Sequence, residues 1–178
     1  MTRDDLAKIL GNKGVEIGTN HGKYASILCQ ANPNLKLTCV DPYVSYVDGH
    51  LVDQQHQDRI YAEAKRTLEK FNIKILRISS MEALKYFEDK SLDFCYIDGN
   101  HAFDFVMSDI IFWSQKVRKG GIVAVHDYHD FKNLRHSGGF SACKGKDVIM
   151  AVDTYVYCHN INSLHITDEK LPTAFWVN

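Results

Sequence analysis

Short apolar segments alternate with longer amphipathic segments along most of this chain, and this alternation limits the possible folds more than any other feature. Apolar runs typical of buried strands are followed by segments with the 3.6-residue period of helices. Such alternation is typical of βαβ units, in which helices cover both faces of a parallel sheet. We therefore predict an α/β fold with strands at 14–17, 35–40, 73–76, 92–97 and 122–125, and helices at 24–30, 53–71, 81–87 and 103–117.

The C-terminal part of the chain follows a different pattern. A predicted helix at 147–158 precedes two strand-like segments, 165–167 and 173–177, which are joined by a short turn-like stretch. So short a connection joins antiparallel strands, because a parallel crossover needs a dozen or more residues. The sheet should thus be mostly parallel and end in an antiparallel hairpin. A short helix is also expected at 3–10, and Gly120 and Gly121 should cap the helix that ends at 116–119.

The composition predicts one domain of ordinary globular type over residues 1–178, since no repeat or linker divides the chain. A formal net charge of -1 gives no basic surface for nucleic acid or an anionic membrane. The apolar runs are too short to span a bilayer, and the first residues lack a secretory apolar core. The five cysteines are scattered and never spaced as CxxC, so we expect a reducing, cytoplasmic location.

Two strand ends carry residues suited to a nucleoside ligand. In open α/β sheets, ligands bind at the carboxyl ends of the strands. Glu16, Gly18 and Gly22 follow the first strand, where glycines let the backbone approach a ligand at a helix N-terminus. The spacing is not the dinucleotide G-x-G-x-x-G, and the Glu16 carboxylate would repel a pyrophosphate but suit an ammonium group. Asp41 ends the second strand, where an acid can accept hydrogen bonds from both ribose hydroxyls, although Pro42 also permits a plain Asp-Pro turn.

The order of the motifs resembles the class I S-adenosylmethionine-dependent methyltransferases over nearly the whole chain. They comprise Glu-x-Gly-x-x-x-Gly at 16–22, Asp41, Ile-Asp-Gly-Asn-His at 97–101 and a run from Gly120 to Tyr128 that ends in His-Asp-Tyr. The last two are similar to the small-molecule O-methyltransferase branch. The resemblance implies a Rossmann-like, doubly wound, seven-stranded sheet of order 3-2-1-4-5-7-6. It also implies transfer of a methyl group from S-adenosylmethionine to a hydroxyl of a small molecule such as a sugar or phenol.

The resemblance also assigns residues to the cofactor. Asp41 would hold the ribose, and Asp98 would lie on the cofactor side of the reacting centre. Ser80 and Met81 would frame the adenine, although Ser80 can also be read as the N-cap of the following helix. The methionine half of the cofactor would lie against the first turn, which has Asn where many relatives have glycine, and so against Glu16, Gly18, Asn20 and Gly22.

Asp98 and Asp127 form a second candidate centre. In the implied strand order they end neighbouring strands, roughly 5 Å apart, and carboxylates that close repel unless one is protonated or a cation separates them. Mg²⁺ fits two carboxylates, and in the catechol-type relatives such an ion binds the acceptor oxygens. Those relatives carry Asn or Asp where this chain has Tyr128. His101 or His126 could replace that ligand, which would favour Mn²⁺, Fe²⁺ or Zn²⁺.

A metal-free mechanism is the alternative at this centre. Imidazole titrates near neutral pH, so His101, His126 or His129 could act as the general base. Two further function classes stay open. A nicotinamide oxidoreductase is disfavoured by the missing glycine fingerprint and by Glu16. A non-catalytic cofactor-binding or partner subunit would be separated from an enzyme by assays for turnover, and homo-oligomeric assembly is left open.

Two connections on the predicted ligand edge are longer than the fold requires. They cover 43–53 and 128–146, and long loops at such an edge are often lids or specificity elements. Gly138 and Gly139 would be a hinge in the second of them.

Overall fold

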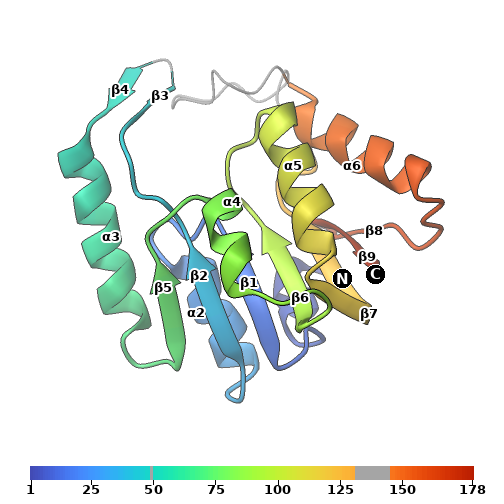
Figure 1. Cartoon of the computed structure of the whole chain (residues 1–178), viewed down its shortest axis with the longest axis horizontal. Helices are drawn as coiled ribbons and strands as arrows, with labels where there is room; N and C mark the ends of the chain where they lie inside the picture. The colour runs from blue at the N-terminus through green and yellow to red at the C-terminus, as the bar shows by residue number, and fades with distance from the viewer. Residues whose placement is uncertain (49, 131–144) are drawn as a thin grey trace.

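The main sheet has the predicted strand order. The structure is a computed structural model that describes residues 1–48, 50–130 and 145–178. Seven strands are hydrogen-bonded in the order β5-β2-β1-β6-β7-β9-β8, which is 3-2-1-4-5-7-6 when only this sheet is numbered (Figure 1). The strands are β1 (Lys13–Ile17), β2 (Lys36–Val40), β5 (Ile73–Leu76), β6 (Leu92–Ile97), β7 (Val117–Val125), β8 (His165–Ile166) and β9 (Ala174–Val177).

The sheet is parallel from β5 to β7 and antiparallel only at its C-terminal end. β1 pairs with β2 and β6 in parallel, whereas β9 pairs antiparallel with both β7 and β8. The predicted hairpin is therefore confirmed. Its turn is closed by the backbone of Thr167, which donates to the carbonyl of Thr173 at 3.0 Å.

Helices cover both faces of the sheet, because each helix has one apolar stripe and each central strand is buried on both sides (Figure 1). Trp113 and Val152 pack on one face, and Leu6 and Leu28 pack on the other. The helices are α1 (Arg3–Ala7), α2 (Lys23–Ala31), α3 (Gln54–Leu68), α4 (Ser80–Ala83) with the 3₁₀ turn η1 (Leu84–Tyr86), α5 (Phe103–Ser114) and α6 (Asp147–Cys158).

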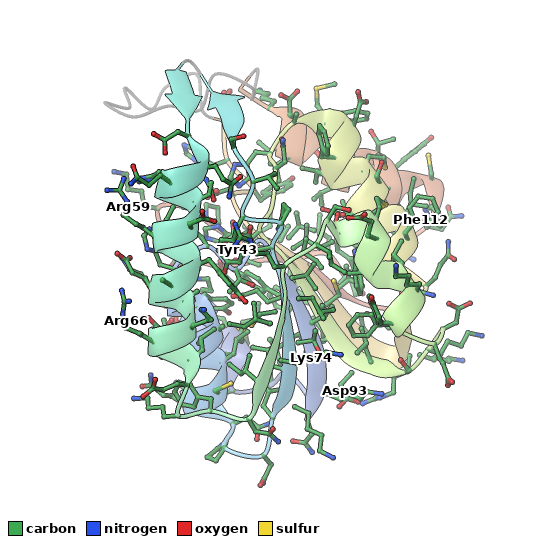
Figure 2. The ribbon with its side chains drawn as sticks, turned by 60° about the vertical axis from the view of Figure 1, so that its left-hand side comes forward. Tyr43, Arg59, Arg66, Lys74, Asp93 and Phe112 are labelled. Carbon is green, nitrogen blue, oxygen red and sulfur yellow. The ribbon has the colours of Figure 1, made fainter. Side chains whose placement is uncertain are left out.

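Helix α3 illustrates this amphipathic packing. Its residues Ile60 and Ala64 pack against the fully buried ring of Tyr43, whereas Arg59 and Arg66 point away from the sheet (Figure 2). This contact anchors the segment that follows β2, and Asp41 lies at the start of that segment.

The predicted helix at 103–117 is wrong at its C-terminal end. Helix α5 ends at Ser114, and Val117 is already the first residue of β7, paired with Leu92 of β6. Gly120 and Gly121 therefore do not cap a helix. They lie within β7 beside a register shift, where a side chain at position 121 would place its Cβ 2.5 Å from the carbonyl oxygen of Asp93. Close approach of two backbones explains the glycine there.

The two long connections have different outcomes. Within 43–53, strands β3 (Tyr46–Asp48) and β4 (His50–Val52) form an antiparallel pair beyond the carboxyl ends of the parallel strands (Figure 1). Most of the second connection, including Gly138 and Gly139, lies outside the described residues. Among the described helices, none combines the length and apolar character needed to cross a membrane.

Candidate active site

The turn after β1 is built around two glycines with left-handed backbone. Gly18 has φ +85°, and a side chain there would place its Cβ 2.0 Å from the carbonyl oxygen of Asp98. Gly22 has φ +74° at the start of α2, and its Cβ would lie 2.9 Å from Leu68. Both positions therefore require glycine for backbone conformation and for space. The first strand end is thereby packed against the end of β6, so the two predicted centres adjoin.

Asp41 joins the end of β2 to this turn. One carboxylate oxygen accepts the N–H of Asn20 at 2.9 Å, and the other accepts the N–H of Tyr43 at 2.9 Å. The Tyr43 hydroxyl in turn donates to the carbonyl of Asn20 at 2.9 Å. Burial raises the pKa of Asp41, and the two backbone donors oppose that rise. Each oxygen retains a lone pair, so Asp41 can hold its own loop and still accept hydroxyl groups.

Glu16 lies beneath the turn and is only 2% exposed. Burial raises its pKa to about 8, with the nearby carboxylate of Asp98 adding to the rise. Its Oε2 atom is buried and has no hydrogen-bond partner within the described part of the chain. A buried carboxyl group with a free acceptor atom is suited to a cationic group brought by a ligand.

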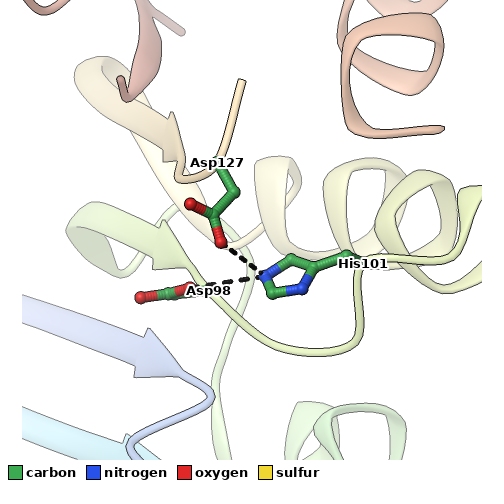
Figure 3. Close-up of side chains that lie close together, drawn as sticks. All are labelled: Asp98, His101 and Asp127. Carbon is green, nitrogen blue, oxygen red and sulfur yellow. Dashed lines mark ion pairs between the residues drawn. The ribbon is translucent and has the colours of Figure 1, made fainter. Parts of the chain in front are cut away.

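Four predicted residues come together at the ends of β6 and β7. Nε2 of His101 lies 3.0 Å from Oδ2 of Asp127 and 3.6 Å from Oδ1 of Asp98 (Figure 3). Nδ1 of His126 lies 3.3 Å from Oδ1 of Asp98 and 3.2 Å from Oδ1 of Asp127. We call these four residues the acid–imidazole cluster. Their proximity is confirmed, whereas their chemical roles stay predictions.

Local backbone geometry turns Asp127 toward the cluster. Its φ of +58° is in the left-handed region, which costs free energy for a residue other than glycine. The carbonyl of Asp127 accepts the N–H of His129 at 2.7 Å, and Tyr128 N–H donates to Pro172 at 2.9 Å. The hydroxyl of Tyr128 donates to Asp153 at 2.7 Å, so Tyr128 does not contribute to the cluster.

Contacts between the carboxylates and the imidazoles determine the pKa values in the cluster. Burial acts to raise the pKa values of Asp98 and Asp127, but His101 and His126 outweigh it, and both pKa values lie below their usual range. Burial likewise acts to lower the pKa of His101, but the two carboxylates raise it to about 9. At neutral pH, His101 is therefore an imidazolium ion between two carboxylates.

Arg3 also reaches the cluster, which the sequence analysis missed. Its Nη1 atom lies 2.9 Å from Nε2 of His126, and its guanidinium lies 4.5 Å from the ring centre of Tyr24. The carboxylates raise the pKa of His126, but the guanidinium has only donors, so this contact needs a lone pair on Nε2. The raised pKa favours a protonated ring, whereas the contact with Arg3 requires a neutral one. We follow the contact and assign His126 as neutral. No motif marks Arg3, which is brought to the site by the packing of α1 against α2 and the sheet.

Three residues of the cluster have a donor set that fits a divalent ion. Asp98, His101 and Asp127 each offer one ligand atom, and these atoms lie within 4.8 Å of one another. Two carboxylates and one imidazole suit Mn²⁺ better than Mg²⁺. His126 is not in this set, and its Nε2 atom is already in contact with Arg3.

The predicted adenine residues lie at the start of α4. Ser79, not Ser80, is the N-cap, because its hydroxyl accepts the N–H of Glu82 at 3.3 Å. The alternative interpretation of Ser80 is therefore wrong by one residue. Ser80 instead faces Asp109, a buried acid of α5 that the sequence analysis missed. Burial raises the pKa of Asp109 to about 6, and Ser80 opposes that rise. Met81 is 36% exposed and free to contact a ligand.

Comparison with known proteins gives a family and a fold. A family model described as a methyltransferase domain matches residues 15–128. An uncharacterized protein, R132 of Acanthamoeba polyphaga mimivirus, is 26% identical over 127 residues, which cover 66% of this chain and 52% of that protein. The chain spans between 13% and 52% of the length of the curated relatives it matches.

Solved structures share the fold at low sequence identity. The O-methyltransferase TomG from Streptomyces achromogenes, solved with S-adenosylmethionine, is 13% identical with a TM-score of 0.62 over 98% of this chain and 77% of that chain. An O-methyltransferase from Bacillus cereus, solved with S-adenosylhomocysteine, is 13% identical with a TM-score of 0.65 over 98% and 78%.

Proposed function

The chain belongs to the methyltransferase domain family, and from this we propose that it transfers the methyl group of S-adenosylmethionine to a hydroxyl oxygen of a small molecule. The observation that carries the proposal is the placement of two centres on one sheet edge. The turn with Glu16 and Asp41 adjoins the acid–imidazole cluster, because Gly18 packs directly against Asp98. A nucleoside sulfonium held at the first centre would present its methyl group to the second.

The cofactor centre would bind the donor through complementary charges and hydrogen bonds. Glu16 would pair with the ammonium group of the methionine half, and Asp41 would accept the ribose hydroxyls with its free lone pairs. The backbone of the turn from Gly18 through Asn20 to Gly22 would approach the cofactor closely, and Ser80 and Met81 would frame the adenine.

The cluster would act on the acceptor. Methyl transfer breaks the sulfur–carbon bond, forms an oxygen–carbon bond and requires the hydroxyl proton to leave, so the acceptor oxygen must be held in line and deprotonated. Asp98, His101 and Asp127 would hold a divalent ion, which when bound lowers the pKa of an acceptor hydroxyl. Without an ion, an imidazole would take the acceptor proton. His101 could do so only after losing its own proton, because its pKa is raised to about 9. Nε2 of His126 is occupied by Arg3, and His129 is the third candidate.

Binding and turnover test the proposal separately. In calorimetry, S-adenosylhomocysteine should bind and raise the melting temperature, while NAD should do neither. Binding of NAD alone would support the oxidoreductase class instead. Turnover should then be assayed with phenols and sugars in the presence of Mn²⁺ or Mg²⁺. Cofactor binding with no turnover on such a panel would favour the non-catalytic class.

A chelator separates the two chemical mechanisms. If the cluster works through a divalent ion, EDTA should abolish methylation and Mn²⁺ should restore it. Full activity in EDTA would exclude the ion and leave His101, His126 or His129 as the base.

The proposal extends to organisation and location. We take residues 1–178 as one methyltransferase domain, since a single seven-stranded sheet draws strands from both ends of the chain. A cytoplasmic location fits the free thiols that the structure describes, namely Cys29, Cys39, Cys95 and Cys158.

A further inference from the structure

We propose that Arg3 is a positioning residue of the acid–imidazole cluster, because its hydrogen bond to Nε2 of His126 holds that imidazole in the tautomer whose proton is on Nδ1, the ring nitrogen next to Asp98 and Asp127. The inference concerns residues of this chain only, although its consequence for methyl transfer rests on the proposed function. It assigns a role to the N-terminal helix, which lies outside the matched segment 15–128.

The backbone and side chain of Arg3 are fixed by several elements. Its N–H donates to Oε1 of Glu169 at 2.9 Å, and its carbonyl accepts the hydroxyl of Tyr24 at 3.1 Å. The guanidinium lies over the Tyr24 ring at 4.5 Å, in a cation–π contact. Helix α1 is itself capped by Thr2 and Asp5, each of which hydrogen-bonds to the backbone of the other. Arg3 is therefore presented to the cluster in one defined position.

The donor and acceptor inventory then determines the state of His126. A guanidinium has N–H donors and no acceptor, so Nη1 of Arg3 at 2.9 Å from Nε2 must donate. Nε2 consequently carries the lone pair, and the ring proton lies on Nδ1. That nitrogen lies 3.3 Å from Oδ1 of Asp98 and 3.2 Å from Oδ1 of Asp127. Neither contact has the geometry of a hydrogen bond, so the proton on Nδ1 interacts with both carboxylates through proximity and charge.

This assignment divides the work between the two histidines. His126 lies next to both carboxylates through its Nδ1 atom and orients them. It cannot offer a lone pair to a substrate or an ion while Arg3 donates to its Nε2 atom. His101 is the imidazole whose Nε2 is grouped with one oxygen each of Asp98 and Asp127. Groups that orient ligating or catalytic side chains in this way commonly change activity by about 10- to 100-fold when removed.

The test uses the imidazole ¹⁵N spectrum of the full chain without cofactor, substrate or added metal, with the His126 signals assigned from His126→Gln. The wild type should show Nδ1 protonated and Nε2 unprotonated at His126 at pH 7. In Arg3→Met, which removes the donor and keeps an apolar stem, Nε2 should gain proton occupancy. Arg3→Lys retains a donor and should preserve the wild-type pattern in part.

A variant of the same helix provides the control. Lys8→Met also removes a cation from the N-terminal segment, but Lys8 pairs with exposed Asp5 and should leave the His126 spectrum unchanged. A doubly protonated or Nε2-protonated His126 in the wild type overturns the proposal, even if Arg3→Met does not fold. An unaltered His126 spectrum in a folded Arg3→Met protein would also overturn the proposal.

Turnover provides a second readout that depends on the proposed function. Arg3→Met should lower kcat by about 10- to 100-fold with little change in affinity for S-adenosylhomocysteine. If the wild type binds no S-adenosylhomocysteine, the proposed function fails while the tautomer result stands. If the wild type binds S-adenosylhomocysteine and Arg3→Met leaves the tautomer of His126 unchanged, only the proposal for Arg3 fails.

Discussion

The carboxyl groups at the ends of β1 and β2 and those at the ends of β6 and β7 lie along one sheet edge, but their pKa values are shifted in opposite directions. Burial raises the pKa values of Glu16 and Asp41, and no cationic side chain in the described ranges hydrogen-bonds to either of them. Asp127 is buried and Asp98 is partly buried, but their contacts with His101 and His126 lower their pKa values. The same residue type thus takes different states because of its partners.

This difference indicates which ligand groups each region can bind. The β1–β2 region has free acceptor atoms, and among the described residues no cationic side chain forms an ion pair with Glu16 or Asp41. It is therefore suited to a ligand that brings positive charge and hydroxyl donors. The cluster already contains its own cations, Arg3 and protonated His101. An incoming divalent ion must therefore displace the proton of His101, which couples occupancy of that centre to pH.

The largest expected effect is on turnover and belongs to the cluster. Asp127→Asn should lower kcat by roughly 100- to 10,000-fold, the usual range for a lost proton-transfer group, because it removes one of the two carboxylates. Affinity for S-adenosylhomocysteine should change by less than about threefold, since contacts in the β1–β2 region are retained. Single-turnover assays and calorimetry measure the two quantities.

Two further variants sharpen this prediction. Adding Asp98→Asn to Asp127→Asn should lower kcat much less than Asp98→Asn does in the wild type, because the effects of residues that act as a unit are not additive. Asp104→Asn, at an exposed position in the first turn of α5, should leave the rate unchanged. A large loss of cofactor affinity in Asp127→Asn would remove the functional distinction between the two regions.

The next effect is on stability and concerns Glu16. Its pKa is raised from 4.5 to about 8 in the folded protein, so the native state binds the proton more tightly than the unfolded state. The stability due to this proton is full below about pH 4.5 and is lost as the pH rises through about 8, by at most about 5 kcal/mol. Glu16→Gln should therefore match the wild type at pH 5 and exceed it at pH 9.

Urea unfolding without ligand measures this difference. The raised pKa values of Asp109 and His101 give slopes of the same sign, but they do so in both proteins and cancel in the comparison. Parallel stability curves for wild type and Glu16→Gln would show that Glu16 is ionised in the fold.

The smallest of the three effects is on cofactor affinity and concerns Asp41. Asp41→Ala should weaken binding of S-adenosylhomocysteine by roughly 1.5–3 kcal/mol, the range for hydrogen bonds to a charged group. At saturating cofactor, kcat should stay within about threefold, in contrast to Asp127→Asn. Asp41→Asn retains one acceptor oxygen for the loop and controls for disruption of the turn. Unchanged affinity in a folded Asp41→Ala protein would exclude Asp41 from the binding site.

Much of the fold could be predicted because its signals are local. Apolar periodicity marked the five parallel strands, and the short connection at 168–170 required the antiparallel end of the sheet. The boundary between α5 and β7 could not be predicted in this way. The cations and glycines at 116–121 have the same local pattern as a helix end, and only pairing with Leu92 places Val117 in the sheet.

At the site, the sequence by itself determined which polar residues end the strands, and the strand order inferred by resemblance brought Asp98, His101, His126 and Asp127 to one place. Tertiary structure alone decided the partners and hence the charges. Arg3 is 123 residues from His126 along the chain and meets it only through packing of α1. The raised pKa of Glu16 likewise follows from its burial beneath the turn. Spacing along a strand is a local property, whereas burial and ion pairing depend on every element that packs around a group.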